Sequence, residues 1–164
     1  MALIFDGRYT ARLERPLVLF LIGMRFNKLI LAHKWLPVFL AMPRMLNELH
    51  QHPEAGLLSQ RSFLSGRTIL VLQYWESFEK LVTYAHATDG AHFPAWAAFN
   101  REIGKSGTVG IWHETYSVEP GKYETVYANM PRFGLASAAQ HVPAVGGLSA
   151  AKDRMAPEPP PSDP

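Results

Sequence analysis

The chain has 164 residues, of which 48% are hydrophobic and 18% charged, a formal net charge of +2 and no cysteine. This length and composition suit one globular domain with a hydrophobic core. The lack of cysteine excludes disulfides, thiolate catalysis and thiolate metal sites, and it favours a cytoplasmic location. No run of Lys and Arg with interleaved aromatic residues is present, so we expect no nucleic-acid partner.

Two strands are predicted near the N-terminus. Residues 3–13 alternate loosely and predict a short leading strand, and Leu17–Phe26 is rich in branched and aromatic residues and predicts the first main strand. The apolar run Pro16–Ile22 is far below the roughly 20 residues that span a bilayer. No small-residue cleavage site follows it, so we expect a buried strand, with neither a membrane anchor nor a signal peptide.

A helix is predicted over residues 29–49, where apolar side chains recur every three or four positions. Pro37 and Pro43 interrupt the pattern, because each proline removes a backbone donor and blocks the preceding turn. We therefore expect a kinked helix or a helix in two parts.

The middle of the chain predicts a hairpin. Residues 57–64 and 67–75 are strand-like runs joined at Ser65-Gly66, a pair that suits a tight turn. The second run is apolar on both faces, which is typical of a central strand.

The remaining elements alternate between helix and strand. Ser77 is the expected N-cap of a second helix, which breaks at residues 88–90 and resumes over 92–99. Residues 109–118 predict a strand, and residues 123–129 predict one more.

This order predicts an α+β fold, the ferredoxin-like βαββαβ unit with extra terminal strands. Its helices cover one face of the sheet, so we expect the other face to be buried in a homodimer. We assign residues 1–133 to this domain. Ala, Gly, Ser and Pro dominate residues 134–164, which we expect to form a flexible tail.

No strong catalytic motif is present, and the sharpest candidate is His113 in the strand over residues 109–118. Alternation places His113 on one face of this strand with Ile111 and Thr115, and Trp112 on the other. An imidazole in apolar surroundings can act as a general base or as an axial ligand of haem iron. The alternative is a histidine at the dimer seam or hydrogen-bonded in the core.

A second candidate group is His92, Trp96 and Asn100, whose spacing of four places them on one helix face. This stripe can line a pocket between helix and sheet. Alternatively, Trp96 packs in the core with Phe99, and His92 only begins the helix.

A third candidate group is basic and follows the first main strand. The group lies at the end of that strand and the entry to the first helix, and it can hold a carboxylate or a haem propionate there or form an ordinary solvated loop. Its members are Arg25, Asn27, His33, Lys34 and Trp35. The remaining histidines show no aromatic or charged setting and are assigned no role: His50, His52, His86 and His141.

Several stretches resemble known proteins. Gln73–Leu81, Tyr84-Ala85 and His92–Trp96 resemble the third strand and second helix of antibiotic-biosynthesis-monooxygenase-like proteins. Residues 15–135 are similar to a bacterial and fungal family known mainly as a domain of unknown function, whose members are called monooxygenase-like or phenylacetaldoxime-dehydratase-like. The motifs that carry this similarity are His33-Lys34-Trp35-Leu36-Pro37, Met42-Pro43-Arg44-Met45, Gly110-Ile111-Trp112-His113-Glu114-Thr115-Tyr116 and Asn129-Met130-Pro131.

The resemblance implies a dimeric α/β barrel. Its superfamily includes cofactor-free oxygenases of aromatic polyketides, haem-degrading enzymes, and haem proteins such as aldoxime dehydratases and dye-decolourising peroxidases. It therefore implies a monooxygenase-like oxidoreductase or a haem-dependent lyase that acts on a largely apolar organic molecule between sheet and helices. The cofactor is then haem or none. The alternative is a non-catalytic dimer that binds a ligand or haem.

The resemblance aligns no haem-ligating histidine onto this chain, so the site residues are chosen from their settings. The candidate catalytic residues are His113, His92 and Arg25. If haem is bound, we expect His113 or His92 as the metal ligand beside Trp96. The candidate substrate-binding residues are Asn27, His33, Tyr74, Trp96, Asn100 and Trp112.

Overall fold

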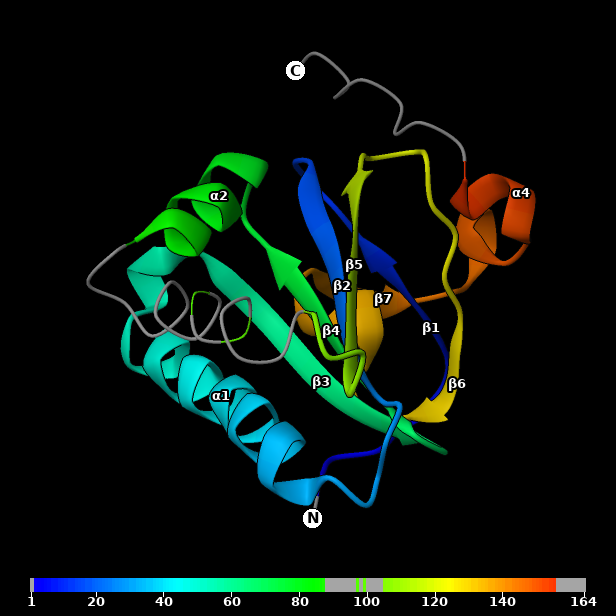
Figure 1. Ribbon diagram of the computed structural model, residues 1–164. Coiled ribbons are helices and arrows are strands. Elements are labelled where there is room, and N and C mark those ends of the chain that lie inside the picture. The colour runs from blue at the N-terminus through cyan, green and yellow to red at the C-terminus, as the bar shows by residue number, and fades with distance from the viewer. Residues whose placement is uncertain (1, 88–96, 98, 100–104, 156–164) are drawn as a thin grey trace. The chain divides into compact units, whose positions relative to one another are not determined.

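The computed structural model describes residues 2–87, 97, 99 and 105–155, and these form two compact units (Figure 1). The central unit is Val18–Tyr116. The terminal unit combines Met1–Leu17 with Ser117–Pro164.

The central unit contains a four-stranded sheet in the order β3-β4-β2-β5. In chain order its elements are β2 (Leu17–Phe26), α1 (Ala32–Gln51), η1 (Pro53–Ala55), β3 (Leu57–Ser65), β4 (Thr68–Trp75), α2 (Phe78–His86) and β5 (Val109–Val118). Each βαβ connection skips over one strand, which is the split crossover of a ferredoxin-like fold. The predicted α+β class and ferredoxin-like topology are confirmed.

The pairing of the central strands fixes which side chains share a face. Strand β2 runs antiparallel to β4 without a register shift, from Val18 opposite Trp75 to Arg25 opposite Thr68. The hairpin between β3 and β4 turns at Gly66, whose φ of 55° lies in the left-handed region that favours glycine. The predicted hairpin and the central position of β4 are therefore confirmed.

The core of the central unit lies between the sheet and its helices. Val18 of β2 and Trp75 of β4 pack with Leu49 of α1 and Leu81 of α2, and Trp75 is only 1% exposed. Since both helices reach the same two strand residues, they cover one face of the sheet, as Figure 1 shows. Helix α2 begins as predicted, because the Ser77 Oγ accepts a hydrogen bond from the Lys80 amide at 3.2 Å.

Helix α1 is one continuous helix that contains both Pro37 and Pro43, so of the two predicted forms the helix in two parts is wrong. Packing on the sheet compensates for the two missing amide hydrogen bonds. Leu46 is buried, and the ring of Trp35 lies 4.7 Å from that of Phe26 on β2.

The terminal unit contains a three-stranded antiparallel sheet in the order β6-β1-β7. Its strands are β1 (Phe5–Arg12), β6 (Tyr127–Met130) and β7 (Gln140–Pro143). The leading strand appears where it was predicted. The strand predicted over residues 123–129 is shorter and begins later, at Tyr127. Tyr123 and Thr125 instead contact the end of β1 through their side chains. The Tyr123 hydroxyl accepts a hydrogen bond from the Leu13 amide, and the Thr125 hydroxyl accepts one from the Ala11 amide.

Residues 134–155 differ from the flexible tail expected over 134–164. They form η2 (Gly134–Ser137), β7, η3 (Gly146–Leu148) and α4 (Ala151–Arg154). Leu135, Ala136 and Ala144 are buried. Small residues pack closely around β1 here, so a composition poor in large side chains still forms a folded segment.

Candidate functional site

The predicted site residues divide between the two faces of the central sheet. His113 lies on the helix-covered face, because its ring contacts that of Phe20 at 5.7 Å and Phe20 packs against the core around Trp75. Trp112 lies on the opposite face of the sheet, where its indole crosses Gly23. This is the alternation expected of a strand.

His113 lies on β5, an edge strand whose side chains from Ile111 to Ser117 are exposed. An exposed imidazole beside an aromatic ring can exchange a proton with a molecule that lies against that ring.

Two other predicted residues share the face of Trp112. Arg25 follows Gly23 on the same side of β2, and a Cβ built on Gly110 would lie 3.8 Å from the Arg25 Cβ. Tyr74, which pairs with Leu19, also points to this face and is 7% exposed. Arg25, Tyr74 and Trp112 therefore share one face, and Arg25 does not share a pocket with His113.

The loop after β2 uses some of its predicted binding groups for local structure. The Asn27 side chain donates to the Gly107 carbonyl at 3.2 Å, and Lys28 donates to the Ser106 carbonyl at 3.4 Å. His33 is exposed in the first turn of α1. A substrate-binding role of Asn27 and His33 stays a prediction. His92, Trp96 and Asn100 lie outside the described residues.

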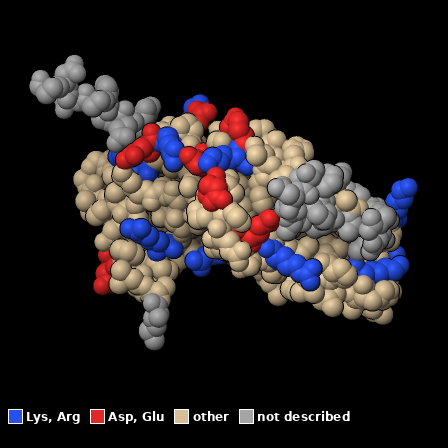
Figure 2. Space-filling view, turned by 90° about the vertical axis from the view of Figure 1, so that its left-hand side faces the viewer, with Lys and Arg blue, Asp and Glu red and all other residues tan. Residues whose placement is uncertain are grey.

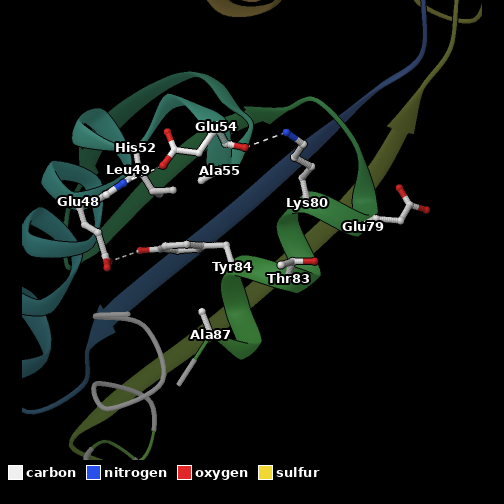
Figure 3. Close-up of a pocket in the computed structure, with 10 residues that line it drawn as sticks. All are labelled: Glu48, Leu49, His52, Glu54, Ala55, Glu79, Lys80, Thr83, Tyr84 and Ala87. Atoms are coloured by element: carbon white, nitrogen blue, oxygen red, sulfur yellow. Dashed lines mark hydrogen bonds and ion pairs between the residues drawn. The ribbon is translucent and has the colours of Figure 1, made fainter. Parts of the chain in front are cut away.

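A hollow of about 590 Å³ lies between the end of α1, η1 and α2 (Figure 3). Its floor is apolar and its rim is polar. The residues that line it are Glu48, Leu49, His52, Glu54, Ala55, Glu79, Lys80, Thr83, Tyr84 and Ala87. None of them was a predicted site residue, since the sequence alone does not show which faces of the two helices meet.

The polar centre of the hollow is the Tyr84–Glu48 pair. Tyr84 points from α2 toward α1, and its hydroxyl donates to the Glu48 carboxylate at 3.1 Å (Figure 3). Burial, followed by the hydrogen bond to Glu48, raises the pKa of Tyr84 above its ordinary value. The phenol therefore stays protonated at neutral pH and holds Glu48 as an acceptor.

The opposite rim is closed by Lys80 and His52, which already have partners. Lys80 donates to the Glu54 carbonyl at 2.8 Å and lies 3.3 Å from the Glu76 carboxylate. The Glu54 carboxylate lies 2.8 Å from the Nδ1 of His52. Its own backbone amide and the His52 hydrogen bond lower the pKa of Glu54. The hollow thus offers carboxylate and phenol groups above an apolar floor.

The aromatic surroundings of His141 are the second feature that the sequence did not predict, because its aromatic neighbours come from other strands. The sequence shows no aromatic setting for it, whereas the structure places its ring beside Phe5, Tyr9 and Tyr127. This correction could not come from local spacing, since the neighbours are more than ten residues away in the chain.

The hollow at Tyr84 does not fit a haem. The hollow is lined by the carboxylates of Glu48, Glu54 and Glu79, which repel haem propionates. Arg25, the cation expected beside a haem, lies on the sheet face opposite His113. We assign no chemical step to haem. Among the described residues, no group of three His, Asp or Glu side chains is placed to hold a metal ion.

Charged side chains of both signs are interspersed on the face that Figure 2 shows. Every helix in the described part of the chain is too short or too polar to cross a bilayer.

Sequence comparison identifies the family. Residues 17–135 match the model of the family described as monooxygenase af470-like. The chain belongs to this family. The monooxygenase af470 of Aspergillus fumigatus is 32% identical over 96 residues, which are 56% of this chain and 33% of that protein. The chain thus spans about a third of the length of this curated relative. The predicted monooxygenase-like family is confirmed.

Structural comparison supports the fold. An aldoxime dehydratase solved in complex with butyraldoxime superposes with a TM-score of 0.66 at 16% identity, over 82% of this chain and 40% of that one. A second aldoxime dehydratase gives a TM-score of 0.66 at 15% identity, over 84% of this chain and 44% of that one. At this identity the likeness concerns the fold, which this family member shares with less than half of each dehydratase.

Proposed function

We propose that this chain is a small-molecule enzyme of the monooxygenase-like type, acting on a largely apolar organic substrate between the sheet and its helices. The observation that carries the proposal is the position of His113. It presents an exposed imidazole on the helix-covered face, against the Phe20 ring, in a chain of the monooxygenase af470-like family.

His113 acts as the base in this proposal. Its imidazole removes a proton from an acidic phenol that lies against Phe20, and the electron-rich anion then reacts with dioxygen. One dioxygen molecule converts a ring CH₂ of the substrate to C=O: one oxygen atom enters the product and the other leaves as water. The substrate supplies all the electrons for this reduction. No external reductant is required.

We further propose a cytoplasmic homodimer whose interface includes the sheet face opposite the helices. That face carries exposed aromatic side chains, with Phe63 at 37%, Trp112 at 36% and Tyr116 at 48%. Exposed apolar groups in this number favour a protein contact. Light scattering tests the dimer against the 18.4 kDa mass of one chain.

The decisive experiment compares oxygen uptake with phenolic substrates by the wild type and His113→Gln. We expect the substitution to lower kcat by about 10²- to 10⁴-fold, the usual contribution of a general base. The matched control is His86→Gln, an exposed histidine at the end of α2. Equal activity of His113→Gln and wild type, with both folded, refutes the role of His113.

The second candidate function is a non-catalytic dimer that binds a ligand, and the apolar-floored hollow at Tyr84 favours it. Oxygen uptake at the background rate, together with saturable ligand binding that Tyr84→Phe weakens, supports this alternative.

The haem-dependent alternative is tested with protein expressed in the presence of a haem precursor. A Soret band that shifts on adding dithionite and disappears in His113→Ala or His92→Ala favours aldoxime-dehydratase-like chemistry. An ultraviolet–visible spectrum with only the aromatic band favours the cofactor-free enzyme or the ligand-binding dimer.

A further inference from the structure

His141 stands in an aromatic cage on one face of the terminal sheet. It lies on β7, opposite Ala11 of β1. Its ring stacks on Tyr9 with centroids 4.5 Å apart and planes at 24°, and it meets the edge of Phe5 at 4.7 Å. Tyr127 of β6 closes the cage at 5.9 Å. All three strands of this sheet therefore contribute to holding one imidazole.

Both ring nitrogens of His141 are buried, and neither has a hydrogen-bond partner among the described residues. A neutral imidazole always carries one N–H and one lone pair, so both groups lose their hydrogen bonds to water on folding. A phenylalanine would fill the same aromatic space without this cost. An unsatisfied buried group of this kind calls for a functional explanation.

The surroundings of His141 oppose a positive charge. Burial, followed by the charge of Arg132, lowers the pKa of His141. The Arg132 guanidinium lies 6.0 Å from the centroid of the Phe5 ring, and Phe5 forms one wall of the cage. Burial raises the pKa of Tyr127, so its phenol supplies no negative charge to the cage at neutral or mildly acidic pH. Among the residues that the structure describes, no carboxylate acts on the imidazole to compensate for protonation.

Strand β7 is a short strand at the edge of the terminal sheet. It has four residues and is paired with β1 alone. Its pairing is extended by the Ala144 amide, which donates to the Arg8 carbonyl at 2.8 Å. A charge that forms on His141 reaches water most easily if β7 separates from β1.

We propose that His141 is a proton-operated latch: its neutral form holds β7 on β1, and its protonation at mildly acidic pH releases β7. A folded-state pKa below the ordinary value of 6.5 means that the open state binds the proton more tightly. The closed state is fully favoured above pH 6.5. It loses stability as the pH falls from 6.5 to the folded pKa.

Hydrogen exchange of residues 140–144 between pH 7.5 and 5, corrected for the intrinsic exchange rates, tests this latch. Below pH 6.5 the opening equilibrium constant should rise by up to about tenfold per pH unit, the limit for uptake of one proton. His141→Phe should abolish this rise and keep β7 closed. In His86→Phe, which changes an exposed histidine, the rise should persist. A rise that is equal in the wild type and His141→Phe overturns the proposal.

A direct titration of the wild type provides the second measurement and requires no folded variant. The His141 Cε1–H signal in NMR spectra should titrate below pH 6.5, and the β7 amide signals should broaden or shift with the same midpoint. Titration at or above 6.5, as expected if an internal water bonds to the imidazole, overturns the proposal. A depressed midpoint without any change in β7 also overturns it.

Discussion

Arg154→Met tests whether residues 134–155 are part of the folded terminal unit. Arg154 is 4% exposed in its side chain and forms a two-point contact with Glu124 through Nε, at 2.7 Å, and the second terminal nitrogen. Its remaining terminal nitrogen donates to the carbonyls of Leu148 and Ser149 at 2.9 and 2.8 Å. This one side chain therefore joins α4, η3 and the segment before β6.

The expected loss of stability follows from the Glu124 carboxylate, which remains without its partner. Removing one partner of a buried ion pair costs about 3–5 kcal/mol, because the other charge stays buried and uncompensated. Glu124 is 29% exposed, so water compensates in part. We therefore expect Arg154→Met to lower the free energy of unfolding of the terminal unit by about 2–3 kcal/mol. Arg154→Lys keeps the charge but cannot bond both partners at once, so its loss should be intermediate.

Urea unfolding followed by circular dichroism, together with hydrogen exchange at β7, measures this loss. Lys152→Met is the matched control, since it removes a cation from the exposed side of the same helix α4. A free energy of unfolding for Arg154→Met within about 0.5 kcal/mol of the wild type, the range of ordinary surface substitutions, would refute the reasoning.

Two further predictions concern the central unit. Gly23→Ala should destabilise by about 1–3 kcal/mol and shift the emission of Trp112, because a Cβ at Gly23 would overlap the indole. In a Trp112→Ala background the same change should be neutral or stabilising, since alanine then only restricts the unfolded chain; a loss in both backgrounds contradicts the steric explanation. Tyr84→Phe should cost about 0.5–1.5 kcal/mol at pH 7 through the lost bond to Glu48. Because the pKa of Tyr84 is raised, its contribution is complete below pH 10 and is lost as the pH rises further, so urea midpoints of wild type and Tyr84→Phe should converge above pH 10.

The sequence by itself determined the local elements of the central unit. The strands Leu17–Phe26 and Val109–Val118 and the cap at Ser77 lie where the sequence predicts them. Alternation, turn chemistry and capping act between residues close in the chain, so they can be read without the fold. The order of these elements, with the rules for short connections, also determined the ferredoxin-like topology.

Strand alternation likewise predicted that His113 and Trp112 point to opposite faces. Only the tertiary structure decided which face the helices cover, and so placed Arg25 away from His113. Strand pairing over long sequence separations determines that choice, and no local pattern carries it.

The hollow at Tyr84, the continuous helix through Pro37 and Pro43, and the cage around His141 depend wholly on tertiary packing. Tyr84 and Glu48 come from different helices, and His141 meets rings from two other strands. Residues 134–155 contain few large apolar side chains, yet they pack on β1 and are held by Arg154. Composition reports how much apolar surface a segment carries, whereas the fit of small residues against a partner strand exists only in the folded chain.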